Sequence, residues 1–466
     1  MKRYHIKSVV SLVMITAICY SCEDFVAVDA PNNKMVREVV FQNDATAQSA
    51  MTGIYNQLFL SAFANGQRNS VTILGGLSGG LLHNIYDSNI ERLQFEQHDL
   101  QPDNSGNLNI WSSAYNMIYM ANSLLEGLEN SNGLTPELSH RLQGEASFIR
   151  AFTYFYLVNL YGEVPLLLST DYNKNQVAER TPMADIYEQI IEDLTLAEEF
   201  LETDYTERER TQVNSFVASA LLARVYLYLE DWQNAAHYSS KVIEAPIYSL
   251  LEDLDQVFLA NSNEAIWQIS PSGGGSFTSH TNEGNLLIID PVFSFLAGLE
   301  LQETFPNLFA EEDQRKTHWI GYNTDLEAFY SYKYKIRSSS EFPIEEYSMV
   351  MRLAEQYLIR SEAQAHLGNL SNALEDLDQI RERAGLPLLS QTTPNLDQAA
   401  ILQSIAEERQ RELFTEWGHR WLDVKRTGTA NEVFAENPFW EPTAIWYPIP
   451  SEERMRNPNL SQNEGY

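Results

Sequence analysis

The segment Ala220-Leu-Leu-Ala-Arg-Val-Tyr-Leu-Tyr-Leu-Glu-Asp-Trp232, with Ala235 just beyond it, has a counterpart 138 residues later. The counterpart runs from Leu358 to Leu370, with Ala373 beyond it. In both copies a helical stretch ends with a leucine and a short turn. A second stretch then opens with a large apolar residue and has an alanine three positions on. The chain therefore repeats a helical hairpin.

Small residues occupy the middle of the first helix in both copies, at Ala223 and Ser361. A small side chain at this point lets the second helix approach closely, while the leucines fill the remaining space. This pattern resembles a tetratricopeptide unit, although any amphipathic helical hairpin shares part of it. Such units are stable only when about three or more stack together, so further pairs are expected elsewhere.

Helical periodicity also marks other parts of the chain. Apolar residues recur at helical spacing from Trp111 to Leu125, and again from Ile149 to Leu160. The second of these helices is predicted to end at Tyr161-Gly162, because glycine is a common residue just past a helix end. Residues 184–202 predict a third helix, and residues 213–230 and 232–245 the first repeated pair. The fold is therefore predicted to be mainly α, with its helical scaffold over 111–245 and 350–425.

Two regions interrupt this pattern, residues 60–108 and residues 246–349. The first is rich in glycine and turn residues, and the second contains short aromatic runs and the Gly/Ser-rich segment 270–280. Binding residues often lie on loops that a rigid frame holds in place. We therefore expect the ligand-binding half of the molecule in these two regions.

The N-terminus predicts export and lipid attachment. A basic start and a short apolar run are followed by Ser21-Cys22 and then by two acidic residues. The run is too short to span a bilayer, which needs about 20 apolar residues. Residues 1–21 are predicted to be a removed lipoprotein signal, with Cys22 acylated as the new N-terminus. An ordinary cleaved signal near a cysteine is the alternative. Residues 22–466 would then form one domain.

Composition excludes several classes of ligand. The net charge of −33 becomes −36 without residues 1–21, which carry three positive and no negative residues. A field of this sign repels nucleic acids and heparin-like polyanions, which need clustered Lys and Arg. Of the two cysteines, Cys19 lies in the predicted signal, so the mature chain has neither a disulfide nor a cysteine metal site.

Catalytic and cofactor motifs are weak or absent from the sequence. Gly76-Leu-Ser-Gly-Gly80 fits the G-x-S-x-G pattern, and a strand over Val71–Leu74 would make Ser78 a candidate nucleophile of a surface hydrolase. The rest of the chain lacks the alternating strands and helices that this enzyme fold needs. No zinc, phosphate-loop, dinucleotide or calcium-loop motif occurs, so neither a metal nor a cofactor is expected. A pair of glycosidase carboxylates cannot be selected among 64 acidic residues.

The segment from Glu407 to Arg426 is rich in charge. We expect one continuous helical face carrying Leu413, Phe414, Trp417 and Trp421. Charged residues at separations of three or four (Arg409, Glu412, Glu416, Arg420) would pair along the same helix. Because unpaired buried charge is costly, this pairing would fix how the helix docks. The segment is thus predicted to be structural and not catalytic.

The same segment carries a resemblance to a known family. Arg409-x-Arg-Glu-Leu-x-x-Glu-x-Gly-x-Arg-Trp-x-Asp-Val-x-Arg426 resembles the C-terminal signature of the SusD/RagB family. The chain end agrees, with Tyr447-Pro-Ile-Pro450 and a final Gln-Asn-Glu-Gly-Tyr466 in which Glu464 replaces the usual proline. Ala50–Asn56 and Ile149–Pro165 also fit, so the likeness covers nearly the whole mature chain.

The resemblance implies a lipoprotein of the outer membrane that faces the exterior. It implies about four tetratricopeptide-like hairpins and a less regular binding half. It also implies that the protein captures a glycan, or in some members a peptide, without chemistry, as the lid of a SusC-like TonB-dependent transporter. Ligand residues of the family lie in variable loops, so our candidates rest on residue type and location. They are Tyr86, Phe277, His280, Trp319 and Tyr322.

Overall fold

The computed structural model describes residues 40–205, 209–271 and 278–466. Helices dominate it, as predicted. The long helices of the described chain are α3 (Asp44–Leu60), α6 (Ser105–Glu129), α7 (Pro136–Tyr161), α9 (Met183–Phe200), α10 (Ser215–Tyr228), α11 (Trp232–Ile243), α14 (Leu353–His366), α15 (Leu370–Arg383) and α17 (Gln398–Glu412). Among these residues, no helix is both long and apolar enough to cross a membrane.

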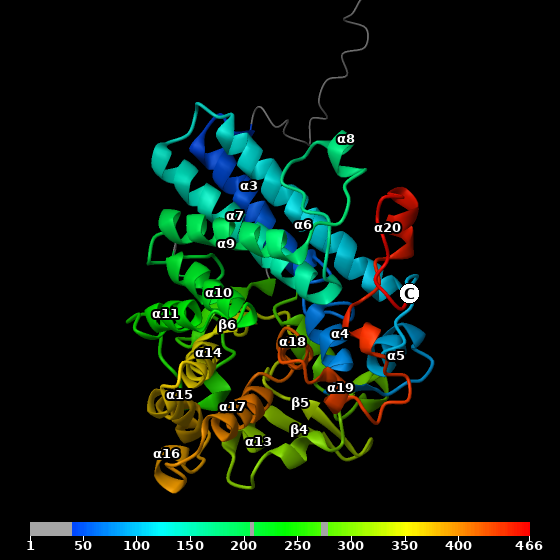
Figure 1. Cartoon of the computed structure of the whole chain (residues 1–466), viewed down its shortest axis with the longest axis vertical. Coiled ribbons are helices and arrows are strands. Elements are labelled where there is room, and N and C mark those ends of the chain that lie inside the picture. The colour runs from blue at the N-terminus through cyan, green and yellow to red at the C-terminus, as the bar shows by residue number, and fades with distance from the viewer. Residues whose placement is uncertain (1–39, 206–208, 272–277) are drawn as a thin grey trace, which may run out of the picture.

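Shorter helices connect and cover these elements. They are α4 (Val71–Ser78), α5 (Ile90–Gln97), α8 (Tyr172–Asn175), α12 (Asn282–Leu287), α13 (Gln314–Trp319), α16 (Leu389–Thr392), α18 (His419–Arg426), α19 (Ala430–Val433) and α20 (Ser451–Arg456). Short 3₁₀ segments occur at 254–256, 294–296, 305–308 and 442–445. Figure 1 shows α3, α6, α7 and α9 stacked at one end of the molecule, with α4 and α5 toward the right of the view and α18 beside α4 near the middle.

Both repeated hairpins are confirmed. Helices α10 and α11 are joined through residues 229–231, and α14 and α15 through residues 367–369. The Ser361 hydroxyl donates a 2.7 Å hydrogen bond to the backbone oxygen of Ala373, so the small residue does mark a close approach of the two helices. Ala223 and Ala235 share a small core cluster with α14 residues Ile359 and Ala363, where one hairpin packs on the other. The count of about four units stays a prediction.

Several predicted helix ends agree with the structure, although α6 and α7 begin earlier than the periodicity from Trp111 and from Ile149 indicated. Helix α7 ends at Tyr161, and Gly162 follows with a φ of 73°, a conformation that favours glycine. Helix α9 spans nearly the stretch predicted over 184–202. Asn214 begins α10 by accepting the backbone N–H of Val217 through its side chain, and Asp231 does the same for Asn234 at the start of α11.

Three small antiparallel strand pairs complete the described fold. Strand β1 (Leu82–Asn84) pairs with β3 (Leu299–Leu301), β2 (Ala265–Ile269) with β6 (Ser348–Arg352), and β4 (Ile320–Asn323) with β5 (Ala328–Ser331). The pair β1–β3 joins the two regions predicted to be loop-rich. The first of these regions is more helical than predicted, since it contains α4 and α5.

Candidate functional site

An exposed apolar loop follows α12 and leads into β3. Four of its side chains are largely open to solvent: Val292, Phe293, Phe295 and Leu296. Phe295 is 64% exposed and Phe293 50%, and their ring centroids lie 6.2 Å apart in an edge-to-face arrangement. Contiguous exposed apolar residues are uncommon on a folded surface and usually mark a binding site.

Tyr86 lies beside this loop. Its side chain is 44% exposed, and its hydroxyl donates a 2.7 Å hydrogen bond to the backbone oxygen of Phe295. Tyr86 comes from the turn after β1, so residues some 200 positions apart meet here because β1 pairs with β3. We call Tyr86, Phe293 and Phe295 the aromatic cluster.

Polar contacts hold the loop in shape. The Asp290 carboxylate accepts the backbone N–H groups of Val292 at 2.8 Å and Phe293 at 2.9 Å. These bonds, with a weaker effect of nearby Arg337, lower the pKa of Asp290. At the other end of the loop, the backbone oxygen of Gly298 accepts the N–H of Ile85 and a guanidinium N–H of Arg92, each at 3.3 Å. The rings are thus presented on a fixed loop.

The sequence had identified Tyr86 but not Phe293 and Phe295. A signal for them existed: Asp290-Pro291 is a turn dipeptide, and Val-Phe-Ser-Phe-Leu follows it. An apolar run of this length usually enters the core, so only the structure distinguishes it from a buried strand.

The other residues predicted to bind the ligand lie on other segments than the aromatic cluster or outside the described residues. Tyr322 is 49% exposed on β4, with its ring 4.8 Å from that of Phe329 across the hairpin. His280 is buried, and its Nδ1 accepts the backbone N–H of Ser339 at 2.9 Å, so it joins two loops. Phe277 and Cys22 lie outside the described residues.

Trp319 is fully buried. Its indole N–H donates to the backbone oxygen of Leu254 at 3.1 Å, and the Lys333 ammonium lies 4.8 Å from its ring centroid. The ring therefore has no free face to offer a ligand. It covers an interior group of charges instead.

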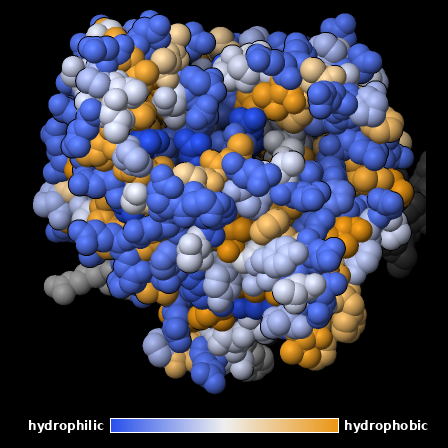
Figure 2. All heavy atoms as spheres, turned by 90° about the horizontal axis from the view of Figure 1, so that it is seen from below, coloured by the Kyte–Doolittle hydropathy of each residue, from blue (hydrophilic) through white to orange (hydrophobic). Residues whose placement is uncertain are grey.

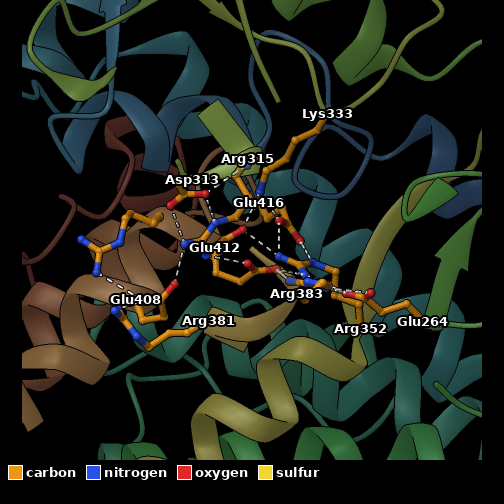
Figure 3. A network of polar contacts seen from close by, with 11 residues as sticks. Glu264, Asp313, Arg315, Lys333, Arg352, Arg381, Arg383, Glu408, Glu412 and Glu416 are labelled. Carbon is orange, nitrogen blue, oxygen red and sulfur yellow. Dashed lines mark hydrogen bonds and ion pairs between the residues drawn. The ribbon is translucent and has the colours of Figure 1, made fainter. Parts of the chain in front are cut away.

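That group is a network of buried ion pairs, which we call the core ion network (Figure 3). It contains Glu264, Asp313, Arg315, Lys333, Arg352, Arg381, Arg383, Glu408, Glu412 and Glu416. Burial alone would raise the pKa of Glu412, but Arg383, Arg352, Arg315 and Lys333 hold it well below its usual range. Burial lowers the pKa of Lys333 to about 8 in spite of Glu416. The carboxylates of the network have exposed fractions of 8% or less and are bonded to cationic side chains from several elements, which indicates a structural network.

The predicted continuous helix over this segment is wrong. Helix α17 ends at Glu412 and α18 begins at His419, with positive φ at Thr415, Trp417 and Gly418 between them. The break turns Glu416 into the core, so its partners are Lys333 and Arg352 from distant elements. Arg409 likewise pairs with Asp423 across the break, at 2.9 Å. Fully buried carboxylates need several donors, and one helix face cannot supply them.

Ser78 does not occupy a nucleophile turn. It is the last residue of helix α4, so the predicted strand over Val71–Leu74 is also wrong. Its buried hydroxyl lies 2.9 Å from that of Tyr447. The glycines around it have a packing role: a Cβ on Gly75 would lie 3.0 Å from the Cα of Gly418, and one on Gly79 3.0 Å from the backbone nitrogen of Trp421. The G-x-S-x-G pattern thus lets α4 pack closely against the start of α18.

The surface around the strand pairs is otherwise polar. Figure 2 shows the face seen from below as mainly hydrophilic, with hydrophobic residues in separate groups. No group of three or more His, Cys, Asp and Glu side chains that could hold a metal occurs in the part of the chain that the structure describes.

Comparisons with known proteins agree with this architecture. Residues 30–227 match a family described as starch-binding and associating with the outer membrane, and residues 320–441 match the SusD family. A SusD-like protein of Formosa agariphila is 26% identical over 99% of both chains. The starch-binding protein SusD of Bacteroides thetaiotaomicron is 24% identical, over 73% of this chain and 75% of its own.

Solved structures show the same fold. A SusD superfamily protein from Bacteroides vulgatus superposes with a TM-score of 0.79 at 20% identity, covering 91% of this chain and 99% of its own. A laminarin-binding SusD-like protein gives a TM-score of 0.77 at 24% identity, covering 91% and 100%.

Proposed function

Because this chain belongs to the SusD/RagB family, we propose that it captures a glycan at the cell surface and hands it unaltered to a TonB-dependent transporter of the outer membrane. It would cover this SusC-like transporter as a lid. Two relatives support a glycan as the ligand, since one is named as starch-binding and another as laminarin-binding.

The observation that carries the proposal is the exposed aromatic cluster. A sugar presents C–H groups on one face and hydroxyls at its rim. Aromatic rings bury the first, and polar groups nearby bond the second. Phe295 and Phe293 offer ring surface at an angle to each other, and Tyr86 adds a third ring. Rings set at angles suit a curved oligosaccharide better than a flat one.

The route to the membrane would be a lipid on Cys22. Acyl chains on the new N-terminus hold a folded domain at the membrane surface, and a two-chain anchor is stable where one chain is marginal. We propose that the domain faces the exterior, with the helical scaffold as the surface that meets the transporter. Binding would involve no catalytic step.

The experiment is a binding titration of the lipid-free domain with laminarin and with starch oligosaccharides. Phe295→Ala should weaken binding about tenfold, equal to ~1.4 kcal/mol, because one stacked ring is lost. Tyr172→Ala is the matched control, since Tyr172 is 73% exposed on α8, away from the cluster, and its removal should leave affinity unchanged.

Equal effects of the two substitutions would place the ligand elsewhere than on the aromatic cluster. Absence of binding to every neutral glycan tested would contradict the function itself.

A further inference from the structure

A hollow lies on the helical scaffold. It is a cavity of about 860 Å³ between α17 on one side and α18 and α19 on the other, with α14 at its base and the exposed α10–α11 turn at its rim. In Figure 1, α14 and α17 lie next to each other at the lower left, and α18 adjoins α17 toward the middle of the molecule. We call it the scaffold groove. Its volume falls within the range of ordinary ligand pockets.

One wall of the scaffold groove is an unpacked face of α17. Ala399, Leu402, Gln403 and Ala406 line it, and the two alanines are exposed to solvent. Val424 lies on the α18 side and Val433 on α19. Ala399, Leu402 and Ala406 on one wall and the two valines on the other form an apolar slot.

The base of the groove carries excess positive charge. Arg409, Arg420 and Arg426 line it, and the carboxylates bonded to these arginines are those of Asp423 and Glu362. The other acidic lining residues, Glu230, Glu407 and Glu432, are exposed. Arg426 uses both oxygens of Glu362, at 2.6 and 2.8 Å, and one of Asp423 at 2.7 Å. The Nε of Arg409 donates to the other oxygen of Asp423 at 2.9 Å, while the Nη1 and Nη2 of this buried guanidinium have no hydrogen-bond partner among the described residues. Both carboxylates are therefore committed to these two arginines.

Arg420 has no bonded carboxylate partner. Within the described chain its guanidinium has neither a hydrogen bond nor an ion pair, and Asp423 acts on it only at longer range. A partly buried guanidinium without a bonded partner is costly, and it binds a carboxylate strongly in a bidentate geometry. This favours a ligand that brings an anion to the base of the groove.

The rim has the opposite charge. Glu230 and Glu432 stand there, both exposed. A sugar would gain little from the groove, because the face of Trp232 is already covered by the His366 ring at 3.9 Å. The groove instead matches a ligand with an anionic end, an apolar body and a cationic group.

We propose that the scaffold groove is a second binding site, which takes a short peptide with its free C-terminal carboxylate on Arg420. Apolar side chains of the peptide would fill the slot against Leu402 and Val424, and a lysine or the free amine would face Glu230 and Glu432. The site is separate from the aromatic cluster and does not depend on the proposed glycan function.

The test uses calorimetric titration of the lipid-free domain with the tetrapeptide Lys-Ala-Leu-Leu and with its C-terminal amide. The acid should bind about tenfold more tightly than the amide, because only the acid can pair with Arg420. Arg420→Gln should remove that difference. Ala406→Trp should abolish binding by filling the slot, and since Ala406 is exposed this variant keeps the fold. Phe295→Ala should leave peptide affinity unchanged.

Equal affinity for acid and amide, or no heat up to about 1 mM peptide, would overturn the proposal. So would a peptide affinity that falls with Phe295→Ala, because the peptide would then occupy the aromatic cluster. A dimer in sedimentation that Ala406→Trp dissociates would assign the groove to a second copy of the chain and would also overturn it.

Discussion

The Glu412 carboxylate is bonded to several cationic side chains in the interior of the molecule. These bonds hold the turn of the chain that follows α17. The carboxylate bonds Arg315, Arg352 and Arg383, and the backbone oxygen of Glu412 accepts from Lys333 at 2.7 Å. Removing one partner from such a network leaves other charges buried and unpaired, which costs more than the pair contributes.

We therefore expect Glu412→Gln to lower the free energy of unfolding by about 3–5 kcal/mol. Glu407→Gln is the control on the same helix, because Glu407 is exposed and lies 3.8 Å from Arg411. It should change stability by less than about 0.5 kcal/mol. Chemical denaturation measures both, and a loss below about 1 kcal/mol for Glu412→Gln would contradict the network's structural role.

Glu283 should make stability depend on pH. It is buried on α12, and burial raises the pKa of its carboxyl from 4.5 to about 7, although Ser348 donates to it. The folded state thus keeps a proton that the unfolded state releases between these values. This contribution to stability is present below pH 4.5 and is lost as the pH rises to 7.

Between pH 4.5 and 8 the free energy of unfolding of the wild type should fall by about 3 kcal/mol relative to that of Glu283→Gln, whose amide cannot titrate. Denaturation curves at several pH values measure the difference. Glu303→Gln, an exposed substitution, should show no such trend. Parallel pH profiles of wild type and Glu283→Gln would contradict a buried neutral carboxyl.

At the scale of elements, glycine decides how closely α4 approaches α18. A Cβ on Gly75 would lie 3.0 Å from the backbone of Gly418, which has a φ of 67° and cannot easily move. Gly53 also sits inside a helix, α3, but nothing lies within 4 Å of its added Cβ.

Substitution by alanine should change stability in opposite directions at Gly75 and at Gly53. Gly75→Ala is expected to destabilise the fold by about 1–3 kcal/mol, because the helices must separate. Gly53→Ala is expected to stabilise it by up to about 1 kcal/mol, since alanine favours a helix. Thermal unfolding measures the signs. Stabilisation by both would mean that α4 is not tightly packed.

The loop of the aromatic cluster should depend on Asp290. Asp290→Ala removes the two backbone bonds that shape the loop, and the rings would lose their fixed orientation before binding. Glycan affinity should fall about threefold to tenfold with little change in the unfolding midpoint. Asp87→Ala is the control on the nearby turn. An unchanged affinity for Asp290→Ala would show that the loop needs no preorganisation.

The helices were predictable from the sequence because their signals are local. Periodicity and Gly162 predicted the second half of α7 and its end, and the repeat predicted both hairpins, whereas the start of α7 at Pro136 was not predicted. The break after Glu412 was missed because tertiary charge pairing overrides helix propensity there. The aromatic cluster was found only in part, through Tyr86, because the pairing of β1 with β3 brings Phe293 and Phe295 to it over a long sequence distance.

At the scale of the whole molecule, the negative net charge agrees with the proposed role as a glycan-binding protein at the cell surface. The chain carries 64 acidic and 31 basic residues, and many of the basic ones are consumed by interior pairs. The surface field is therefore strongly negative, which keeps polyanions away and leaves neutral glycans as the ligands that approach freely.

The central claim is capture without conversion, and the most direct measurement is equilibrium dialysis of the lipid-free domain with laminarin oligosaccharides labelled at the reducing end. The label should concentrate on the protein side, and mass analysis after prolonged incubation should recover every oligosaccharide at its original length. Equal concentrations of the label on the two sides of the dialysis membrane, or recovery of shortened oligosaccharides, would contradict the account.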